Sequence, residues 1–170
     1  MMKIFLTIAF VLASFFLSTQ EVEAQTKFGY VSSQELITAM PEFKKADTLL
    51  QEYEGALNGQ YEDMVQDFRV KDSLLRSRDT TKYTKAQLEL KRRELAQLYQ
   101  KIQGWQQEAG RLYQNRQQEL MTPIYDKARK VITDVAKENG FTYVFAKEQL
   151  LSSPPGDDLL PLIKKKLNLK

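Results

Sequence analysis

Two long runs of apolar residues, spaced alternately by three and four positions, dominate the chain. The first run covers residues 43–75 and is interrupted by Lys71, while the second covers residues 88–135 and is interrupted by Lys91 and Arg116. This spacing places apolar side chains on one face of a helix and, when sustained over several heptads, is typical of a coiled coil. The pattern therefore predicts two long helices that pack along a shared apolar seam.

Local signals bound these two helices. Met40-Pro41 predicts the start of the first, because proline suits the first helical turn. Asn139-Gly140 predicts the end of the second. Residues 79–82 lie in a stretch without seam residues and predict the turn. We expect helices over about 41–78 and 84–139, each about 60 to 80 Å long at 1.5 Å per residue, which is too long for a compact globule.

Short elements flank this hairpin. Residues 27–31 and 141–145 predict strands, residues 149–152 a weaker strand, residues 33–39 a short helix, and Asp157-Asp158 the cap of a last helix that ends near Leu167. The expected fold is α+β and mostly helical. A β-containing oligomerisation body is formed by residues 25–40 and 124–170, and an antiparallel coiled-coil tentacle by residues 41–123.

Three short strands make a sheet too small to be stable alone, so we expect several copies of the protein to pool their strands in a homo-oligomer. The residues expected to build this body are Phe28, Tyr30, Val31, Val144 and Phe145. A monomeric bundle, with the arms folded back at a glycine, is the alternative.

Glycines and one proline predict a soft zone in the arms. With the turn centred between residues 80 and 81, Gly104 falls between the levels of Gly55 and Gly59 on the other arm. A glycine costs about 0.8 to 1 kcal/mol relative to alanine in a helix. Pro123 should kink its helix close to Pro41, where the arms leave the body. Close helix packing is the alternative explanation for the glycines.

Charge is concentrated near the turn. The chain has a formal charge of only +3, yet residues 76–93 carry seven basic and two acidic side chains. The basic side chains are Arg76, Arg78, Lys82, Lys85, Lys91, Arg92 and Arg93, which we call the basic tip. Such a tip should attract acidic protein segments or anionic lipid headgroups, unless it is only a solvated helix face. Nucleic acid is not expected, because no groove-reading motif is present.

Apolar and aromatic residues on the arms exceed what one seam needs. Six of them are candidates for binding other polypeptides as well as for packing between the arms: Tyr61, Met64, Phe68, Leu95, Leu98 and Tyr99. Surplus surface of this kind suits a promiscuous binder of non-native proteins, although ordinary packing is the alternative for each seam residue.

The first 24 residues predict a cleaved secretory signal peptide. Lys3 precedes an apolar run over residues 4–17, and Ala24 provides the small residue of a cleavage site. Removing this leader raises the formal charge to +4, because one basic and two acidic residues are lost. The chain has no Cys and no His, so disulfides, thiolate nucleophiles, His-based triads and Cys/His metal sites are excluded. We expect no enzyme activity, no metal and no cofactor.

The order of these features resembles a known family. In chain order, the features are the strand Phe28-Gly29-Tyr30-Val31, the break at Met40-Pro41-Glu42, the long charged hairpin, Pro123-Ile124-Tyr125, the segment over residues 139–145 and the terminal helix after Asp157-Asp158. Together they resemble the Skp family of periplasmic chaperones, also called OmpH-like proteins. The resemblance covers essentially the whole sequence after the leader.

The resemblance implies a jellyfish-like homotrimer in the periplasm, with a small β body and three helical tentacles around a cavity. It implies an ATP-independent holdase that binds unfolded outer-membrane proteins before their insertion. It also implies contact with lipopolysaccharide through basic arm residues, for which Lys91-Arg92-Arg93 is the candidate. A structural envelope protein, whose hairpin bridges a specific partner or a membrane surface, is the alternative function.

Overall fold

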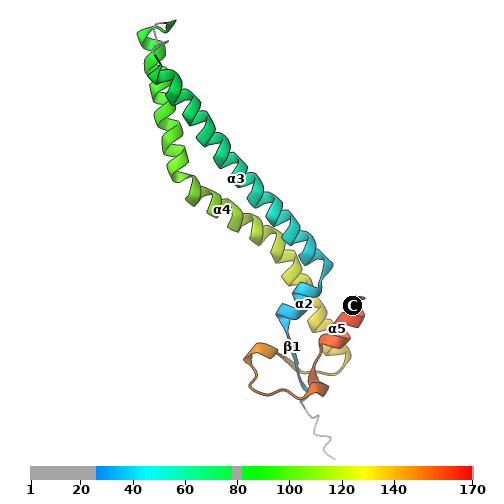
Figure 1. Cartoon of the computed structure of the whole chain (residues 1–170). Coiled ribbons are helices and arrows are strands. Elements are labelled where there is room, and N and C mark those ends of the chain that lie inside the picture. The colour runs from blue at the N-terminus through cyan, green and yellow to red at the C-terminus, as the bar shows by residue number, and fades with distance from the viewer. Residues whose placement is uncertain (1–25, 78–81, 170) are drawn as a thin grey trace, which may run out of the picture.

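The computed structural model describes residues 26–77 and 82–169. It consists of a small body from which a long hairpin of two helices projects, α3 (Pro41–Arg76) and α4 (Lys85–Glu138) (Figure 1). The predicted mostly helical α+β fold with a long antiparallel hairpin is confirmed. The predicted signal peptide, Arg78 and most of the predicted turn lie outside the described residues.

The helix boundaries follow from local capping chemistry. Pro41 occupies the first position of α3, where its missing N–H is not needed. Thr84 caps α4 with a reciprocal pair of hydrogen bonds. Its hydroxyl accepts from the Gln87 backbone N–H at 3.3 Å, and its own backbone N–H donates to the Gln87 side chain at 2.8 Å. Both helices therefore start where the sequence predicts, within one residue.

The C-terminal end of α4 is a Schellman motif. Gly140 adopts a left-handed φ of 73°, and the Phe141 N–H donates to the Ala136 carbonyl at 2.9 Å. The chain reversal buries the Phe141 ring against the end of the helix, leaving it 9% exposed. Phe141 thus belongs to the helix cap, and the following strand begins at Tyr143 rather than at the predicted residue 141.

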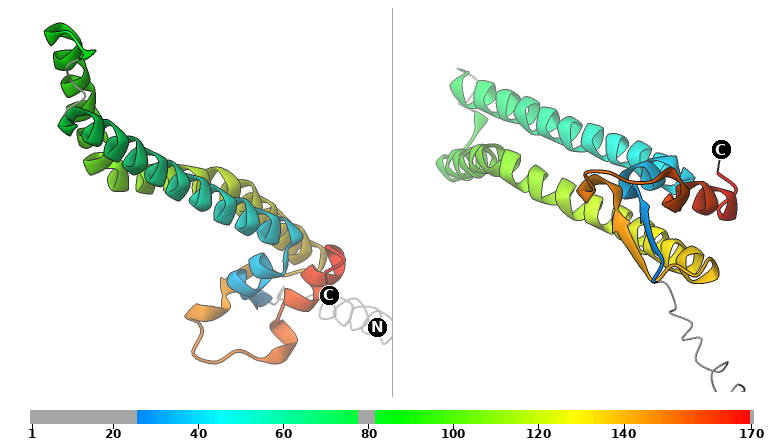
Figure 2. Two further views of the ribbon diagram at one scale, coloured as in Figure 1. Left: turned by 45° about the horizontal axis from the view of Figure 1, so that its top comes forward. Right: turned by 90° about the horizontal axis from the view of Figure 1, so that it is seen from below.

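The sheet has two parallel strands in the described part of the protein, β1 (Phe28–Val31) and β2 (Tyr143–Ala146) (Figure 2). Gly29 is paired with Val144 in the register. The whole helical hairpin forms the crossover connection that parallel pairing requires.

The predicted weak strand over residues 149–152 is wrong. Lys147–Gln149 is a 3₁₀ turn, η2, and the backbone then runs irregularly to a second such turn, η3 (Pro155–Asp157). The two prolines at 154 and 155 lack the N–H donors that a ladder needs. Only an isolated bridge between Tyr30 and Asp158 extends the sheet on this side, within the residues that the structure describes.

The C-terminal part of α4 packs against two short helices, α2 (Ser33–Ala39) and α5 (Leu160–Lys166), and against Val31 of β1 to form the body core. Four side chains at its centre are almost completely buried: Leu36, Met40, Leu159 and Ile163. The last helix begins at Leu160, later than predicted, and its N-cap residue is Leu159 rather than the predicted Asp157-Asp158. Asp158 precedes the N-cap and accepts the Leu160 N–H at 2.9 Å. Gly29 allows Leu159 and Phe141 to approach β1 closely, because a Cβ there would lie 2.3 Å from a Leu159 methyl carbon.

The pairing of the arms differs from the predicted register. A hairpin centred between residues 80 and 81 would place Phe68 opposite Arg93, whereas the ring of Phe68 lies 5.9 Å from that of Tyr99. The cause is an asymmetric connection, because α4 is much longer than α3 and its first turns extend past the partner's end (Figure 1). Gly104 is therefore displaced towards the tip and does not lie between Gly55 and Gly59.

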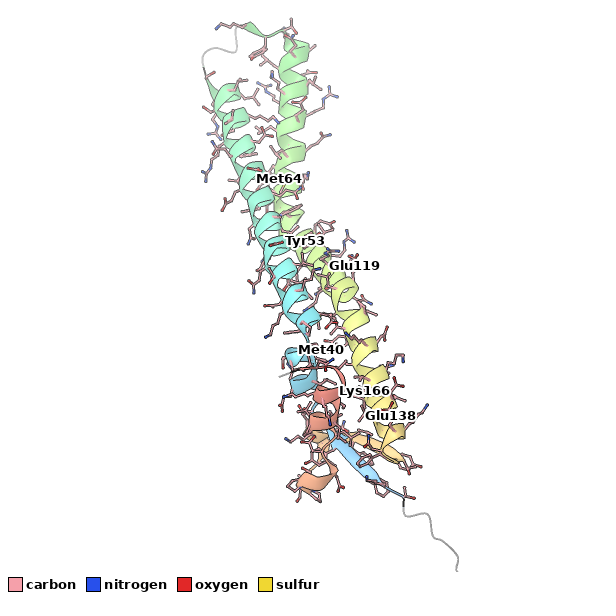
Figure 3. The ribbon with its side chains drawn as sticks, turned by 90° about the vertical axis from the view of Figure 1, so that its right-hand side faces the viewer. Met40, Tyr53, Met64, Glu119, Glu138 and Lys166 are labelled. Carbon is pink, nitrogen blue, oxygen red and sulfur yellow. The ribbon has the colours of Figure 1, made fainter. Side chains whose placement is uncertain are left out.

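The second arm is not straight. Helix α4 changes direction roughly halfway along the hairpin, on the tip side of Glu119 in Figure 3. Pro123 lies inside α4 on the other side of Glu119, nearer the body, and the helix continues through it. The bend therefore lies on the tip side of Glu119 and not at Pro123, where the sequence predicts it.

Candidate functional site

The middle of the hairpin is held together by a small apolar cluster. Its buried members are Leu57, Met64 and Trp105, which we call the arm cluster, and each is 7% exposed. Tyr53, Leu98, Ile102, Ala109, Leu112 and Tyr113 pack around them. Trp105, a predicted seam residue, is thus buried between the helices and does not provide an exposed aromatic surface.

The six predicted client-binding residues fall into two groups. Met64 is buried in the arm cluster, and Phe68, Leu95 and Leu98 are partly buried along the seam. Tyr61 and Tyr99 are 43% and 47% exposed, respectively. The structure thus brings the first four into arm packing and leaves two tyrosines facing solvent.

Other exposed apolar residues extend this surface. Val70 and Leu90 are each 56% exposed near the tip, and Tyr125 is 49% exposed near the body. Leu90 lies beside the seam in the heptad pattern, but Val70 has no signal in the sequence beyond its apolar character. An open hairpin with large apolar side chains in solvent is a surface suited to weak, nonspecific contacts with apolar segments.

The basic tip is partly neutralised. Arg76 pairs with Asp72 at 2.8 Å, and Arg93 lies 3.8 Å from Glu89. The ammonium group of Lys91 lies 5.0 Å from the centre of the Tyr83 ring, a cation–π distance. Asp72 lies outside the window counted from the sequence, so the positive charge at the tip is smaller than that count suggests.

A second exposed apolar surface lies on the sheet. Phe28, Tyr143 and Phe145, which we call the sheet face, are 51%, 56% and 43% exposed. The Phe28 ring stacks on that of Tyr143 at 5.7 Å and lies 6.0 Å from that of Phe145. Leu151, on the loop that follows η2, is completely exposed.

The predicted oligomer-body residues divide accordingly. Tyr30 and Val31 are buried inside the protein's own body, and Val144 packs against the same core. Phe28 and Phe145 point outwards. Sequence reasoning missed Tyr143 and Leu151 as surface residues, although the two-residue alternation of Tyr143 with Phe145 could have found the former.

The arm glycines open onto solvent. A Cβ added at Gly55, Gly59, Gly104 or Gly110 would meet no atom within 4 Å. Close packing between α3 and α4 therefore does not explain these glycines.

Ion pairs connect the arms to each other and the short helices to one another. Glu42 in α3 accepts a hydrogen bond from Lys127 in α4, and Lys164 in α5 bonds Glu35 in α2 at 3.0 Å. The pKa of Glu42 is lowered from its usual value, chiefly because Lys127 donates to its carboxylate. Ser32 donates to Glu148 at 2.6 Å and lowers the pKa of that carboxyl group in the same way. These contacts fix how the hairpin leaves the body.

Two further features bear on the kind of site that the described residues can form: acidic clusters that could bind a metal ion and helices that could span a membrane. Within residues 26–77 and 82–169, no group of three or more acidic side chains is arranged to hold a metal ion. None of the helices in these ranges is long and apolar enough to span a membrane.

The fold and its surfaces define a class of protein: an open helical hairpin with exposed aromatic side chains, mounted on a small mixed body. The family model described as outer membrane protein (OmpH-like) matches residues 27–167, so the protein belongs to the OmpH-like family.

One solved structure has the same fold. It is described as a candidate outer membrane chaperone (OmpH-like) from Caulobacter crescentus CB15, is 17% identical, covers 83% of each of the two proteins and gives a TM-score of 0.65. The comparison with curated proteins gives no match.

Proposed function

We propose that this protein is an ATP-independent holdase chaperone of the periplasm, which binds unfolded outer-membrane proteins and prevents their aggregation before insertion. The observation that carries the proposal is the open hairpin of an OmpH-like protein with large apolar side chains in solvent, above all Tyr61 and Tyr99. Many weak contacts of this kind can hold a non-native polypeptide without a chemical energy source.

The chaperone works as a homotrimer in this proposal. The sheet face presents three adjacent aromatic rings to solvent, and a sheet of two short strands is marginal by itself. Covering this face with neighbouring copies would bury apolar surface and place the three hairpins around a common space. The number of copies comes from the family resemblance.

Periplasmic location rests on the leader over residues 1–24, whose basic start, apolar run and small-residue exit are typical of export. Without Cys, the exported protein depends on packing and assembly for its stability.

The basic tip would provide a second, electrostatic contact. We expect Lys91, Arg92 and Arg93 to favour anionic lipid or lipopolysaccharide near a membrane surface. Co-sedimentation with anionic vesicles should weaken as salt rises and should fall when all three are changed to alanine.

An aggregation assay tests the central proposal. A urea-unfolded outer-membrane β-barrel is diluted into buffer with a few-fold molar excess of this protein, and light scattering is followed. We expect strong suppression, reduced severalfold by Tyr61→Ser with Tyr99→Ser. Leu162→Ser, at a residue 39% exposed on α5, is the matched control and should leave suppression unchanged.

Absence of suppression by the unaltered protein would overturn the proposal. A pull-down from an envelope extract then distinguishes the alternative. A chaperone should recover many different β-barrel precursors in this pull-down. A structural envelope protein should recover one partner in a fixed stoichiometry.

A further inference from the structure

Helix α4 carries an unusual row of glutamines. Nine of its residues are Gln, and eight of these lie within residues 97–118. Seven of these eight are exposed and fall within a sector of about 120° on a helix of 3.6 residues per turn. The six of them that border hollows along the arm are called the carboxamide track. They are Gln103, Gln106, Gln107, Gln114, Gln117 and Gln118.

The track borders three hollows that follow one another along the arm. The first, about 430 Å³, lies beside Tyr61 and Ile102, the second, about 490 Å³, spans Gly104 and Gly110, and the third, about 420 Å³, lies beside Tyr113. Gln106 borders both the first and the second hollow, and Gln114 borders both the second and the third. The hollows therefore form one continuous surface, lined by carboxamides throughout and by aromatic side chains at its two ends.

The carboxamides of the track have their hydrogen-bonding capacity available. In the described part of the protein, no hydrogen bond involves the side-chain carboxamide of any of the six, and the Thr122 hydroxyl bonds only the backbone carbonyl of Gln118. Gln51 and Gln87, by contrast, are bonded through their side chains to Asp47 and Thr84. Each free carboxamide offers one acceptor oxygen and two donor hydrogens.

We propose that the carboxamide track binds the backbone of an extended segment of the client polypeptide. This inference rests on the proposed holdase function and names the group that is recognised. A carboxamide presents the same donor and acceptor as a peptide group, so it can pair with backbone carbonyl and N–H groups whatever the client sequence.

The dimensions of the track fit this occupant. From Gln103 to Gln118 the helix rises about 22 Å at 1.5 Å per residue. A strand of about seven residues covers that length at about 3.3 Å per residue. The hollows beside Tyr61 and Tyr113 would take alternate client side chains. Neutral hydrogen bonds are insensitive to salt, in contrast to contacts at the basic tip.

A peptide pair tests the proposal directly. The probe is a peptide of about fourteen residues built from Thr, Ala and Gly, with capped termini and a neutral BODIPY label, about twice the length of the track. Its partner has the same sequence with alternate peptide nitrogens methylated. Binding to the full protein is measured by fluorescence anisotropy at low and high salt. We expect the parent peptide to bind with the same affinity at both salt concentrations and the methylated peptide to bind about tenfold more weakly, because it lacks half of the N–H donors.

Protein variants locate the contact. Gln107→Ala, Gln114→Ala and Gln118→Ala together should weaken binding of the parent peptide about tenfold, because three carboxamide partners are lost. The control carries Gln60→Ala, Gln66→Ala and Gln97→Ala, exposed glutamines that line none of the three hollows, and should bind as the unaltered protein does. All six changes replace an exposed helical residue with a better helix former, so folding is preserved.

Each outcome decides between the two proposals. Failure of the unaltered protein to suppress aggregation would overturn the holdase function. Suppression of aggregation with equal binding of both peptides, or with equal losses in the two triple variants, would overturn the track and leave the holdase function standing. Displacement of the parent peptide by chitotetraose at similar concentration would assign the surface to saccharides and would also overturn the track.

Discussion

Lys127 of α4 donates a hydrogen bond to Glu42 of α3 across 85 residues of sequence, and within residues 26–77 and 82–169 this is the one ion pair that joins the two arms. Glu138 at the end of α4 pairs with Lys166 of α5, and the other ion pairs of the arms connect residues three or four positions apart on a single helix. The second Glu42 oxygen is buried and has no hydrogen-bond partner. The pair therefore fixes the register of the hairpin where it leaves the body.

Removing this ion pair should loosen the base of the hairpin. In a double-mutant cycle with Glu42→Gln and Lys127→Met, we expect a coupling energy of about 0.3 to 1 kcal/mol, because the side chains of Glu42 and Lys127 are 42% and 48% exposed and solvent screens the pair. Urea unfolding at neutral pH measures it, with Lys44→Met as the control.

The same coupling should depend on pH. The pKa of Glu42 is lowered in the folded state, so its stabilising effect is present above the unfolded value of 4.5 and is lost as pH falls through the folded value. The cycle repeated in acid, about 1.5 pH units below the unfolded value, should therefore give a smaller coupling energy. An equal coupling at both pH values would contradict the assignment.

Gly29→Ala should destabilise the body. The new Cβ would lie 2.3 Å from a Leu159 carbon and 2.8 Å from a Phe141 ring carbon, so the core must shift. Overpacking of this kind costs about 1 to 3 kcal/mol. Gly156→Ala is the control, because a Cβ there meets nothing within 4 Å. Chemical denaturation should separate the two variants clearly, and similar midpoints would reject the close approach.

Leu57→Ala should weaken the middle of the hairpin, where the arm cluster holds the helices together. Leu57 is 7% exposed, and truncating a buried leucine lowers the free energy of unfolding by about 2 to 5 kcal/mol. We expect a loss near the lower end of this range, because Leu57 packs between only two helices. The fluorescence of Trp105, a buried member of the same cluster, reports the opening as a red shift at lower denaturant. Leu90→Ala, at a residue 56% exposed, should leave the shift unchanged.

Much of this fold could be predicted from local sequence signals. The two helices follow from the apolar seam, and their ends follow from capping signals at Pro41, Thr84 and Asn139-Gly140. Each of these signals depends only on residues a few positions away in the sequence, so no tertiary information is needed. The register of the arms depends on how far α4 extends past α3, which the seam does not encode because it repeats every heptad. The predicted level of Gly104 was wrong for this reason.

The surfaces were harder to predict than the helices. A seam pattern marks Met64 and Leu98 as apolar, but whether such a residue is covered or exposed depends on the partner helix. Likewise, Tyr30 and Phe145 read alike in sequence and are partners in the strand register, so they lie on the same face of the sheet. Tyr30, which also bridges to Asp158, is only 5% exposed, whereas Phe145 is 43% exposed. Burial is a tertiary property, and it decided which candidates remain available for binding.

Changing the sheet face should alter the oligomeric state. The double substitution Phe28→Ser and Phe145→Ser removes two of the three adjacent aromatic rings that a single protomer leaves in solvent. We expect sedimentation velocity to show an assembly for the unaltered protein and a monomer for the variant at micromolar concentration. Far-UV circular dichroism should remain strongly helical, because most of the helical residues belong to α3 and α4. An unaltered protein that sediments as a monomer would contradict the assembly.

Replacing the arm glycines should stiffen the hairpin. A Cβ at Gly104 or Gly110 meets no neighbouring atom, so Gly104→Ala with Gly110→Ala should add about 0.8 to 1 kcal/mol of helix stability per site. Hydrogen exchange should be fast in this stretch of the unaltered protein and around Gly55 and Gly59, and slower in the variant. If the bend of α4 lets the arms adapt to clients of different size, the variant should also suppress aggregation of large β-barrels less well than that of small ones. Uniformly slow exchange along both arms of the unaltered protein would reject a soft zone at these glycines.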